Sequence, residues 1–321
     1  MDVLEVQHLV QKIKTNIQRV MVGKDETIDQ LLVALISSGH VLLEDVPGTG
    51  KTLLAKSMAK SLSCSFKRIQ FTPDLLPTDV TGINFYNQKK GEFEFRPGPL
   101  FSNILLADEI NRATPRTQSS LLESMEERQV TIDGDTRALQ APFIVIATQN
   151  PLESQGTFPL PEAQLDRFLL KINLGYPTRQ EGIDILRRFK KSNPLENLEA
   201  VASQQDILQI QHFYSSTYVS DDLLAYIMDI VEKTRVHANI AVGVSPRGSQ
   251  ALFKAVQAHA VIQGRDYVLP DDVKQMVKPV LSHRIQIRRM AGLKSNPADS
   301  ILDEIIETVV VPSEAGVLES K

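Results

Sequence analysis

Two kinds of hydrophobic pattern divide this chain at about residue 174. Before that point, short apolar runs alternate with helical stretches and with turns rich in Gly and Pro. Apolar runs bounded by turn residues are typical of buried strands, and their alternation with helices predicts βα units around a mainly parallel sheet. The predicted strands are residues 41–44, 67–71, 104–108, 143–148 and 168–174. The first part of the chain is therefore predicted to have an α/β fold.

Helical spacing dominates the remainder. Residues 2–20 place apolar side chains three and four positions apart, which predicts an amphipathic helix ahead of the first strand. After Tyr176-Pro177 the strand pattern disappears. The helical pattern then returns over residues 179–191, 205–217, 220–235, 246–263, 270–280 and 298–309. Because 321 residues suffice for two domains, we expect an α/β domain over residues 1–178 and an all-helical domain over residues 179–321.

Two segments inside the α/β part alternate between apolar and polar residues as hairpins do. Residues 85–95 alternate around Lys90-Gly91, and residues 130–136, within an insert of about 130–140, contain Asp133-Gly134. Asp-Gly favours the tight turn that joins two antiparallel strands. We expect both hairpins at the surface, either as simple connections or projecting toward a substrate or a subunit.

Composition and charge exclude several classes of protein. Hydrophobic residues make up 42% of the chain and charged residues 23%, as in ordinary globular proteins. The 35 basic and 39 acidic side chains give a net charge of −4, which argues against a strongly basic nucleic-acid-binding protein. The best membrane candidate, residues 31–43, is shorter than the ~20 residues that a spanning helix needs. We therefore expect neither a nucleic-acid partner nor a membrane span.

The N-terminal sequence and the cysteine content both indicate a cytoplasmic protein. Asp2 and Glu5 occupy the region in which a secretory signal carries basic residues. Cys64 is the only cysteine, so it cannot form a disulfide within the chain, which is typical of proteins in a reducing compartment. We expect a cytoplasmic location.

Residues 41–52, Val-Leu-Leu-Glu-Asp-Val-Pro-Gly-Thr-Gly-Lys-Thr, combine a strand, a tight turn and the start of a helix. Gly48 and Gly50 let the backbone approach an anion closely, and the following helix adds the positive end of its dipole. In such a loop Lys51 reaches the β- and γ-phosphates, and the Thr52 hydroxyl binds Mg²⁺. Asp45 stands where the pattern has Gly, although Asp tolerates positive φ better than most residues. A chance Gly-Lys-Thr turn is the alternative interpretation.

A second acidic segment supplies the other half of a nucleotide site. The apolar run that begins at residue 104 ends in Asp108 and Glu109. Asp108 is placed to hold the Mg²⁺ shell, and Glu109 to activate the attacking water. Adjacent acids at a strand end are common on surfaces, so by themselves they fit a solvated strand end equally well. Together with the phosphate loop they predict binding and hydrolysis of ATP with Mg²⁺.

Four motifs in this chain resemble those of the AAA+ ATPases, and specifically of the MoxR family. They are residues 44–52 (Glu-Asp-Val-Pro-Gly-Thr-Gly-Lys-Thr), 107–113 (Ala-Asp-Glu-Ile-Asn-Arg-Ala), 147–151 (Ala-Thr-Gln-Asn-Pro) and 162–168 (Glu-Ala-Gln-Leu-Asp-Arg-Phe). The resemblance extends from about residue 20 to residue 305, and Asp45 is usual in the phosphate loops of this family. It implies an α/β P-loop AAA+ core with a parallel sheet, followed by a C-terminal all-helical lid domain.

The resemblance also implies which residues bind the cofactors, ATP and Mg²⁺. In the phosphate loop these are Asp45, Val46, Pro47, Gly48, Thr49, Gly50, Lys51, Thr52 and Leu53. Val22 and Gly23 resemble the segment that AAA+ proteins place over the adenine. Thr52 and Asp108 would hold the metal.

Three further residues acquire catalytic roles beside Glu109 through the resemblance alone. Asn150 resembles the sensor-1 residue that orients the attacking water. Arg167 resembles the arginine finger that is presented to a neighbouring subunit, and Arg247 resembles the sensor-2 arginine, a lid residue that contacts the γ-phosphate. Without the motif, Asn150 is a turn residue at a strand end, and Arg167 forms a surface ion pair with Asp166 or Glu162.

The function that the resemblance implies is that of a ring-forming ATPase, a hexamer, which remodels protein complexes or assists their maturation. Its partner would contain a von Willebrand factor A domain, and the two hairpins resemble inserts that line a central pore. A nucleotide-gated assembly scaffold and a nucleic-acid motor are alternatives; Lys89 and Lys90 at a hairpin tip are the support for the motor. The basic residues Arg284, Arg288 and Arg289 are expected to form a solvated face or a subunit contact.

Overall fold

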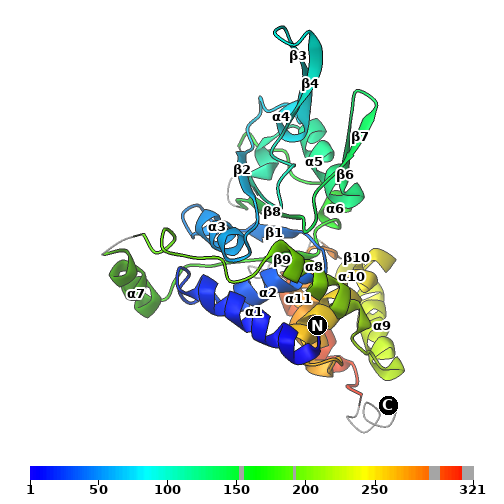
Figure 1. The fold of residues 1–321 in the computed structure, drawn as a ribbon. Coiled ribbons are helices and arrows are strands. Elements are labelled where there is room, and N and C mark those ends of the chain that lie inside the picture. The colour runs from blue at the N-terminus through cyan, green and yellow to red at the C-terminus, as the bar shows by residue number, and fades with distance from the viewer. Residues whose placement is uncertain (152–154, 191–192, 289–296, 313–321) are drawn as a thin grey trace.

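The structure is a computed structural model that describes residues 1–151, 155–190, 193–288 and 297–312. Its centre is a sheet with the strand order β2-β5-β8-β1-β9, in which every neighbouring pair is parallel (Figure 1). The strands are β1 (Val41–Glu44), β2 (Phe66–Gln70), β5 (Ile104–Asp108), β8 (Ile144–Gln149) and β9 (Leu170–Ile172). The prediction of an α/β fold with a parallel sheet is confirmed, although β2 and β8 are displaced by one residue and β9 is shorter than predicted.

Alternate residues of the central strands pack on opposite faces of the sheet. Val41, Leu43 and Ile104 join one buried cluster, whereas Leu42 and Leu105 join another. Successive side chains of a strand point to opposite sides, and both sides of this sheet are covered, so its strands are apolar throughout. The first cluster is covered by α1 (Val3–Gln18), α2 (Asp25–Ile36), α3 (Lys51–Ser61) and C-terminal helices, and the second by α4 (Pro77–Thr81) and α5 (Pro115–Glu127).

The C-terminal part is mainly helical, as predicted. Its helices are α7 (Arg179–Phe189), α8 (Gln204–Phe213), α9 (Asp221–Val236), α10 (Pro246–Ile262), α11 (Pro270–Leu281) and α12 (Pro297–Thr308). The prediction that this part is all-helical is wrong in one respect, because β10 (Ile240–Val242) and β11 (Gln286–Ile287) form an antiparallel pair. Strands this short leave no alternating pattern in the sequence.

Helices from both ends of the chain pack together. α10 lies against α1 and α2, and one buried cluster contains residues of all three helices. The apolar core is therefore continuous across the predicted domain boundary at residue 178, which itself remains a prediction. Within the described ranges, no helix combines the length and the apolar character needed to cross a membrane.

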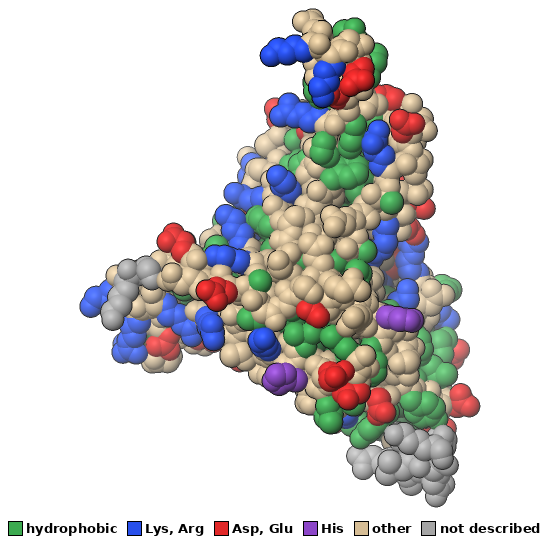
Figure 2. Space-filling model, in the orientation of Figure 1, with side chains coloured by type: hydrophobic (Ala, Val, Ile, Leu, Met, Phe, Trp, Pro, Cys, Tyr) green, Lys and Arg blue, Asp and Glu red, His purple; other side chains and the backbone are tan. Residues whose placement is uncertain are grey.

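Both predicted hairpins are present and project from the same end of the molecule (Figure 1). The first pairs β3 (Gly82–Asn87) with β4 (Glu92–Pro97), and the second pairs β6 (Gln129–Ile132) with β7 (Asp135–Ala138). The two hairpins contact each other through a hydrogen bond in which Asn84 Nδ2 donates to Asp133 Oδ2 at 2.9 Å. At the tip of the first hairpin Lys90 pairs with Glu94, so basic and acidic side chains lie together there (Figure 2).

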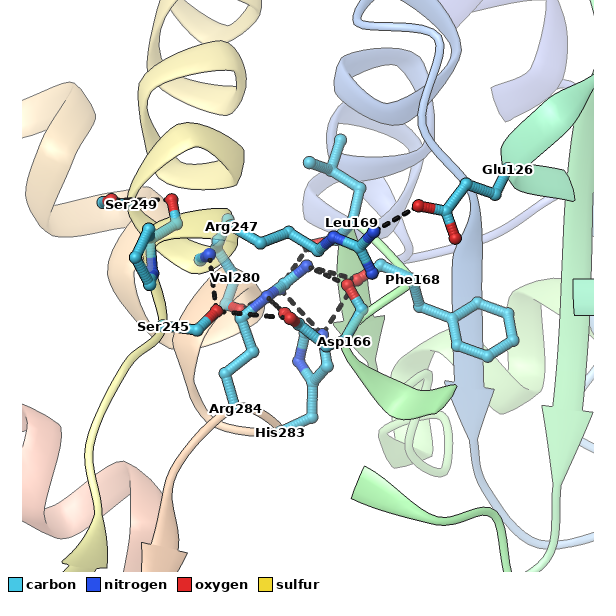
Figure 3. Close-up of polar contacts among 12 residues, drawn as sticks. Glu126, Asp166, Phe168, Leu169, Ser245, Arg247, Ser249, Val280, His283 and Arg284 are labelled. Atoms are coloured by element: carbon cyan, nitrogen blue, oxygen red, sulfur yellow. Dashed lines mark hydrogen bonds and ion pairs between the residues drawn. The ribbon is translucent and has the colours of Figure 1, made fainter. Parts of the chain in front are cut away.

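Arg284, between α11 and β11, fastens the C-terminal helices to the core (Figure 3). Its side chain is 2% exposed, and its Nε donates to Asp166 Oδ1 at 2.7 Å. Nη2 donates to the carbonyl oxygens of Asp166 at 3.0 Å and Phe168 at 2.7 Å, and Nη1 donates to that of Leu169 at 3.1 Å. The turn that contains Arg167 thus supplies the acceptors that a buried guanidinium requires.

This contact corrects the prediction of a solvated basic face or subunit contact in this region. Arg284 is buried within the chain, because its guanidinium finds a full set of acceptors in the core. The Arg288 Nε donates to the carbonyl oxygen of Ile240 at 3.2 Å, which links the two short C-terminal strands. Arg289 lies outside the described residues.

His40, just before β1, is a second buried polar anchor. Its Nδ1 accepts a hydrogen bond from the Val145 N–H at 2.9 Å, and its Nε2 lies 3.0 Å from the Met125 carbonyl oxygen. Because Nδ1 accepts, Nε2 carries the proton and donates, and the ring is neutral. Burial, assisted by the positive charge of Arg128, lowers the pKa of His40 to about 3.

The depressed pKa of His40 predicts an acid-sensitive fold. Below pH 6.5, the pKa of His40 in the unfolded chain, the unfolded chain binds a proton at His40 that the folded chain does not bind. The free energy of unfolding therefore falls by about 1.4 kcal/mol per pH unit until the pH nears the folded pKa. His40→Gln should remove about 2 kcal/mol of the loss between about pH 7 and pH 5, as measured by urea unfolding. His8→Gln, at an exposed site, should leave the loss unchanged. Equal slopes for His40→Gln and the wild type would contradict this assignment.

The Arg284 contacts predict a large stability loss on substitution. Arg284→Met leaves the Asp166 carboxylate and several buried carbonyl groups without their donor, which should cost about 3–5 kcal/mol in chemical unfolding. Arg187→Met removes a pair with Asp184 in which the arginine side chain is 72% exposed, and it should cost below about 1 kcal/mol. Similar small losses in both variants would show that Arg284 does not anchor the helices.

Candidate functional site

The phosphate loop connects β1 to α3 at the carboxyl edge of the sheet. Gly48 and Gly50 both have left-handed φ values, +86° and +95°, which favour glycine. A side chain at Gly48 would meet no atom within 4 Å, so the loop is open toward solvent at that point. The loop therefore forms a cradle with backbone groups at its surface.

The N-terminus of α3 differs from those of several other helices. Asp2, Thr178 and Ser203 each accept a hydrogen bond from the first turn of α1, α7 or α8, whereas the N-cap residue of α3 is Gly50, which has no side chain. The first N–H groups of α3 thus receive no side-chain acceptor. Together with the helix dipole, this arrangement suits a bound anion.

Asp45 shapes this loop from within. Its carboxylate is buried and accepts hydrogen bonds from the N–H of Val46 at 2.7 Å and of Gly175 at 3.1 Å. The Lys51 ammonium donates to the carbonyl oxygens of Asp45 at 3.0 Å and Val46 at 2.9 Å. Asp45, which departs from the usual loop pattern, therefore uses its carboxylate to bind backbone N–H groups.

Asp108 and Glu109 end β5 next to this loop, as predicted. Asp108 Oδ1 accepts from the Thr148 hydroxyl at 2.6 Å, and Oδ2 accepts from Arg68 Nη2 at 2.7 Å. Glu109 is left-handed, with φ 55° and ψ 50°, a conformation that costs a non-glycine residue energy and is common at functional sites. Gln70 Nε2 donates to Glu109 Oε2 at 2.8 Å.

The Arg112 guanidinium also pairs with Glu109, with 2.9 Å between Arg112 Nε and Glu109 Oε2. Gln70 and Arg112 therefore hold the same carboxylate oxygen from two sides. The position of the Glu109 carboxylate is therefore fixed by two neighbouring side chains.

A cavity of about 430 Å³ joins these groups, within the roughly 300–1,000 Å³ of small-molecule sites. It is lined by Asp45, Pro47, Gly48, Gly50, Lys51, Thr52, Leu53, Arg68, Gln70, Asp108, Glu109, Thr148, Gln149 and Asn150. Predicted phosphate-loop residues thus meet Asp108, Glu109 and Asn150 in one space. Val46 and Thr49 are not among the lining residues, and the Thr49 hydroxyl donates to the Val46 carbonyl oxygen at 3.3 Å.

Four of these lining residues were not predicted as site residues from the sequence: Arg68, Gln70, Thr148 and Gln149. Arg68 and Gln70 stand at alternate positions near the end of β2, and β2 pairs with β5. Polar residues at period two near a strand's carboxyl end are the signal that could have found them.

Val22 and Gly23 do not line this cavity but lie beside it. The Met21 Cε methyl is 3.5 Å from the point where a side chain on Gly50 would begin. Gly23 is left-handed, and a side chain there would collide with the Glu181 carboxylate of α7. The predicted adenine segment thus runs from Met21, near the phosphate loop, to Gly23, beside α7, where it is exposed.

Arg167 and Arg247 lie elsewhere, in a second cavity of about 400 Å³. Both pair with Glu126: Arg167 Nε lies 3.1 Å from Glu126 Oε2, and Arg247 Nη2 contacts Glu126 Oε1. The alternative interpretation, in which Arg167 pairs with Asp166 or Glu162, is therefore wrong about the partner, which is Glu126. Arg247 lines this second cavity and not the phosphate cavity, and its predicted contact with the γ-phosphate stays a prediction.

The residues at the first cavity fit a nucleotide with its metal. Mg²⁺ prefers oxygen ligands and is typically held by one or two carboxylates together with phosphates. The Thr52 hydroxyl and the Asp108 carboxylate supply such oxygens beside the open loop. Each carboxylate oxygen can accept more than one hydrogen bond or ligand, so the contacts of Asp108 with Thr148 and Arg68 leave room for the metal shell.

Comparison with known proteins agrees with this geometry. Residues 40–170 match the ATPase family associated with various cellular activities (AAA), and residues 232–305 match the AAA lid domain. The crystal structure of a protein from Cytophaga hutchinsonii, described as "a putative ATPase", superposes with a TM-score of 0.90 at 39% identity, over 97% of both chains.

Two relatives cover nearly the whole chain. The uncharacterized protein YeaC of Bacillus subtilis is 52% identical over 95% of both chains. Chaperone MoxR1 of Mycobacterium tuberculosis is 41% identical over 95% of this chain and 83% of its own. This chain belongs to the MoxR family of AAA+ ATPases.

Proposed function

We propose that this protein binds Mg-ATP at the first cavity and hydrolyses it within a ring of subunits, a hexamer. One observation carries the proposal: the phosphate loop and the arginine pair occupy two separate cavities of the same chain. A lone chain then has the binding half of the site without the arginines, and a neighbour's Arg167 and Arg247 complete it. This extends the role of Arg247 from its own site to that of a neighbouring subunit.

The roles of the chain's own residues follow from their positions. The N-terminus of α3 and Lys51 bind the phosphates, with Thr52 and Asp108 holding Mg²⁺, which neutralises phosphate charge when bound. Glu109 accepts a proton from the attacking water, and Asn150 orients that water. The water oxygen bonds to the γ-phosphorus as the bond to ADP breaks, giving ADP and phosphate.

We further propose that turnover drives remodelling or maturation of protein complexes, with a von Willebrand factor A domain protein as partner, in the cytoplasm. The relative named Chaperone MoxR1 supports a chaperone-like role. The first hairpin, β3 and β4, exposes Phe85, Tyr86 and Phe93, which suit contact with a protein client. The nucleic-acid motor has weaker support, because Lys90 at the hairpin tip is paired with Glu94.

Glu109→Gln tests whether hydrolysis occurs at this site. The amide cannot take the proton, so the hydrolysis rate should fall about 10²–10⁴-fold while ATP binding is retained. Lys51→Ala is the binding control and should weaken ATP affinity about 10- to 100-fold, because a charge-assisted contact is lost. Both variants are assayed by phosphate release and by calorimetric titration. Full client remodelling by Glu109→Gln would instead favour the nucleotide-gated scaffold.

Mixing experiments test whether sites are completed by a neighbour. Arg167→Ala should bind ATP but hydrolyse it about 10³–10⁵-fold more slowly. In a mixture with Lys51→Ala, an intact Arg167 from the second variant meets an intact phosphate loop from the first, so phosphate release should recover in part. Absence of recovery in a mixture that sediments as assembled rings would contradict the shared site.

A further inference from the structure

Glu126 lies near the C-terminal end of α5 and contacts two arginines that are far apart in sequence. Arg167 follows the short helix α6 (Glu162–Leu165), and Arg247 begins α10. The Glu126 and Arg247 side chains reach toward each other across the boundary between core and C-terminal helices (Figure 3). One carboxylate thus holds the two guanidiniums that the proposed function assigns to a neighbour's nucleotide.

Asp166, the other acid that lines this cavity, binds groups other than Arg167 and Arg247. The cavity is lined by five basic side chains, Arg128, Arg167, Arg247, Lys254 and Arg284, and by two acidic ones, Glu126 and Asp166. Asp166 accepts hydrogen bonds from Arg284 at 2.7 Å and from the Ser245 hydroxyl at 3.2 Å. Glu126 is therefore the carboxylate that balances Arg167 and Arg247, in a cavity whose net charge is positive.

The ion pairs that Glu126 forms with Arg167 and Arg247 are weak enough for a phosphate to replace Glu126. The side chains of Glu126, Arg167 and Arg247 are 36%, 30% and 47% exposed, and exposed ion pairs are weak. Arg167 Nε is a buried atom that lies within ion-pair distance of Glu126 without an aligned hydrogen bond. A phosphate oxyanion offers both arginines shorter, bidentate and more strongly charged contacts.

The position of Glu126 also argues against a role in helix stability. Acidic side chains near a helix C-terminus are unfavourable because the dipole is negative there, and the last turn of α5 contains no basic residue to offset them. What stabilises Glu126 in this place is the arginine pair.

We infer that Glu126 is an intramolecular counter-ion that occupies Arg167 and Arg247 and is displaced by the triphosphate of a neighbouring subunit on assembly. This inference rests on the proposed function. Glu126 thus opposes premature engagement of the arginines. Each subunit contact must break these two ion pairs before the arginines reach the nucleotide.

The test compares Glu126→Gln with Glu127→Gln, an exposed neighbour on the same helix. ATP hydrolysis per subunit is measured over a wide range of protein concentration with saturating Mg-ATP. Losing the competing carboxylate should lower the protein concentration for half-maximal activity roughly threefold to tenfold, with the maximal rate retained. Glu127→Gln should match the wild type, and Glu126→Asp, which keeps the charge, should lie between the wild type and Glu126→Gln.

Two outcomes would overturn the inference. An unchanged half-activating concentration in Glu126→Gln would make the contact a passive surface pair. A raised concentration, or a lower maximal rate at an unchanged thermal unfolding midpoint, would mean that Glu126 orients the arginines for catalysis.

A second measurement does not depend on turnover. Sedimentation of the same Glu126 variants with ATP in the Glu109→Gln background should show assembly at a roughly threefold to tenfold lower protein concentration. If the wild type never hydrolyses ATP, the proposed enzyme fails while this assembly shift still tests Glu126. If wild-type hydrolysis depends on Arg167 but neither shift occurs, the inference about Glu126 alone fails.

Discussion

The arrangement of this molecule depends on one buried guanidinium. Arg284 is nearly inaccessible to water, and a charge in that position is tolerated only with a paired acid and a full set of acceptors. Asp166, Phe168 and Leu169, at one core turn next to Arg167, supply four of those acceptors, and the Val280 carbonyl group of α11 supplies another. The segment that follows α11 must therefore dock at that turn, and α10, which packs on α11, brings Arg247 with it.

This docking separates the two halves of the proposed site. The described residues that line the phosphate cavity belong to the α/β core, whereas the arginine cavity is shared between the core and α10. A surface that donates arginines and a different surface that binds phosphate favour a head-to-tail contact between copies, and such contacts form rings when the rotation closes. A continuous apolar cluster packs beneath α10.

The arginine cavity also lies close in sequence to one of the hairpins. Glu126 and Arg128 stand at the end of α5, and β6 begins at Gln129. Arg128 donates hydrogen bonds to the carbonyl oxygens of Ser38 and Phe143, which anchors this corner to the core. A change at Glu126 is therefore only a few residues from a strand that contacts the other exposed hairpin. The Glu126 contact thus lies a few residues from the second hairpin, which in turn contacts the hairpin proposed to meet the client.

Much of the site could be predicted from the sequence because its determinants are local. The glycines at 48 and 50 and the helix start at Lys51 lie within a short segment whose backbone conformation its own residues favour. The acids at 108 and 109 come directly at the end of an apolar run. The parallel sheet was predictable for a similar reason, since both of its faces are covered and each strand is an uninterrupted apolar run. The hydrogen bond between the buried Asp45 carboxylate and the Gly175 N–H could not be predicted, because Gly175 is distant in the chain.

Contacts between distant segments were decided by the tertiary structure alone. The approach of Gln70 to Glu109, the burial of Arg284 and the pairing of Glu126 with Arg167 and Arg247 each join residues about 40 or more positions apart. No local pattern marks such a partner, because exposed and buried arginines have the same side chain and differ only in the acceptors that the fold brings to them. The sequence by itself determined the sheet, the phosphate loop and the acids beside it. The position of the arginines, away from their own nucleotide, required packing of the complete chain.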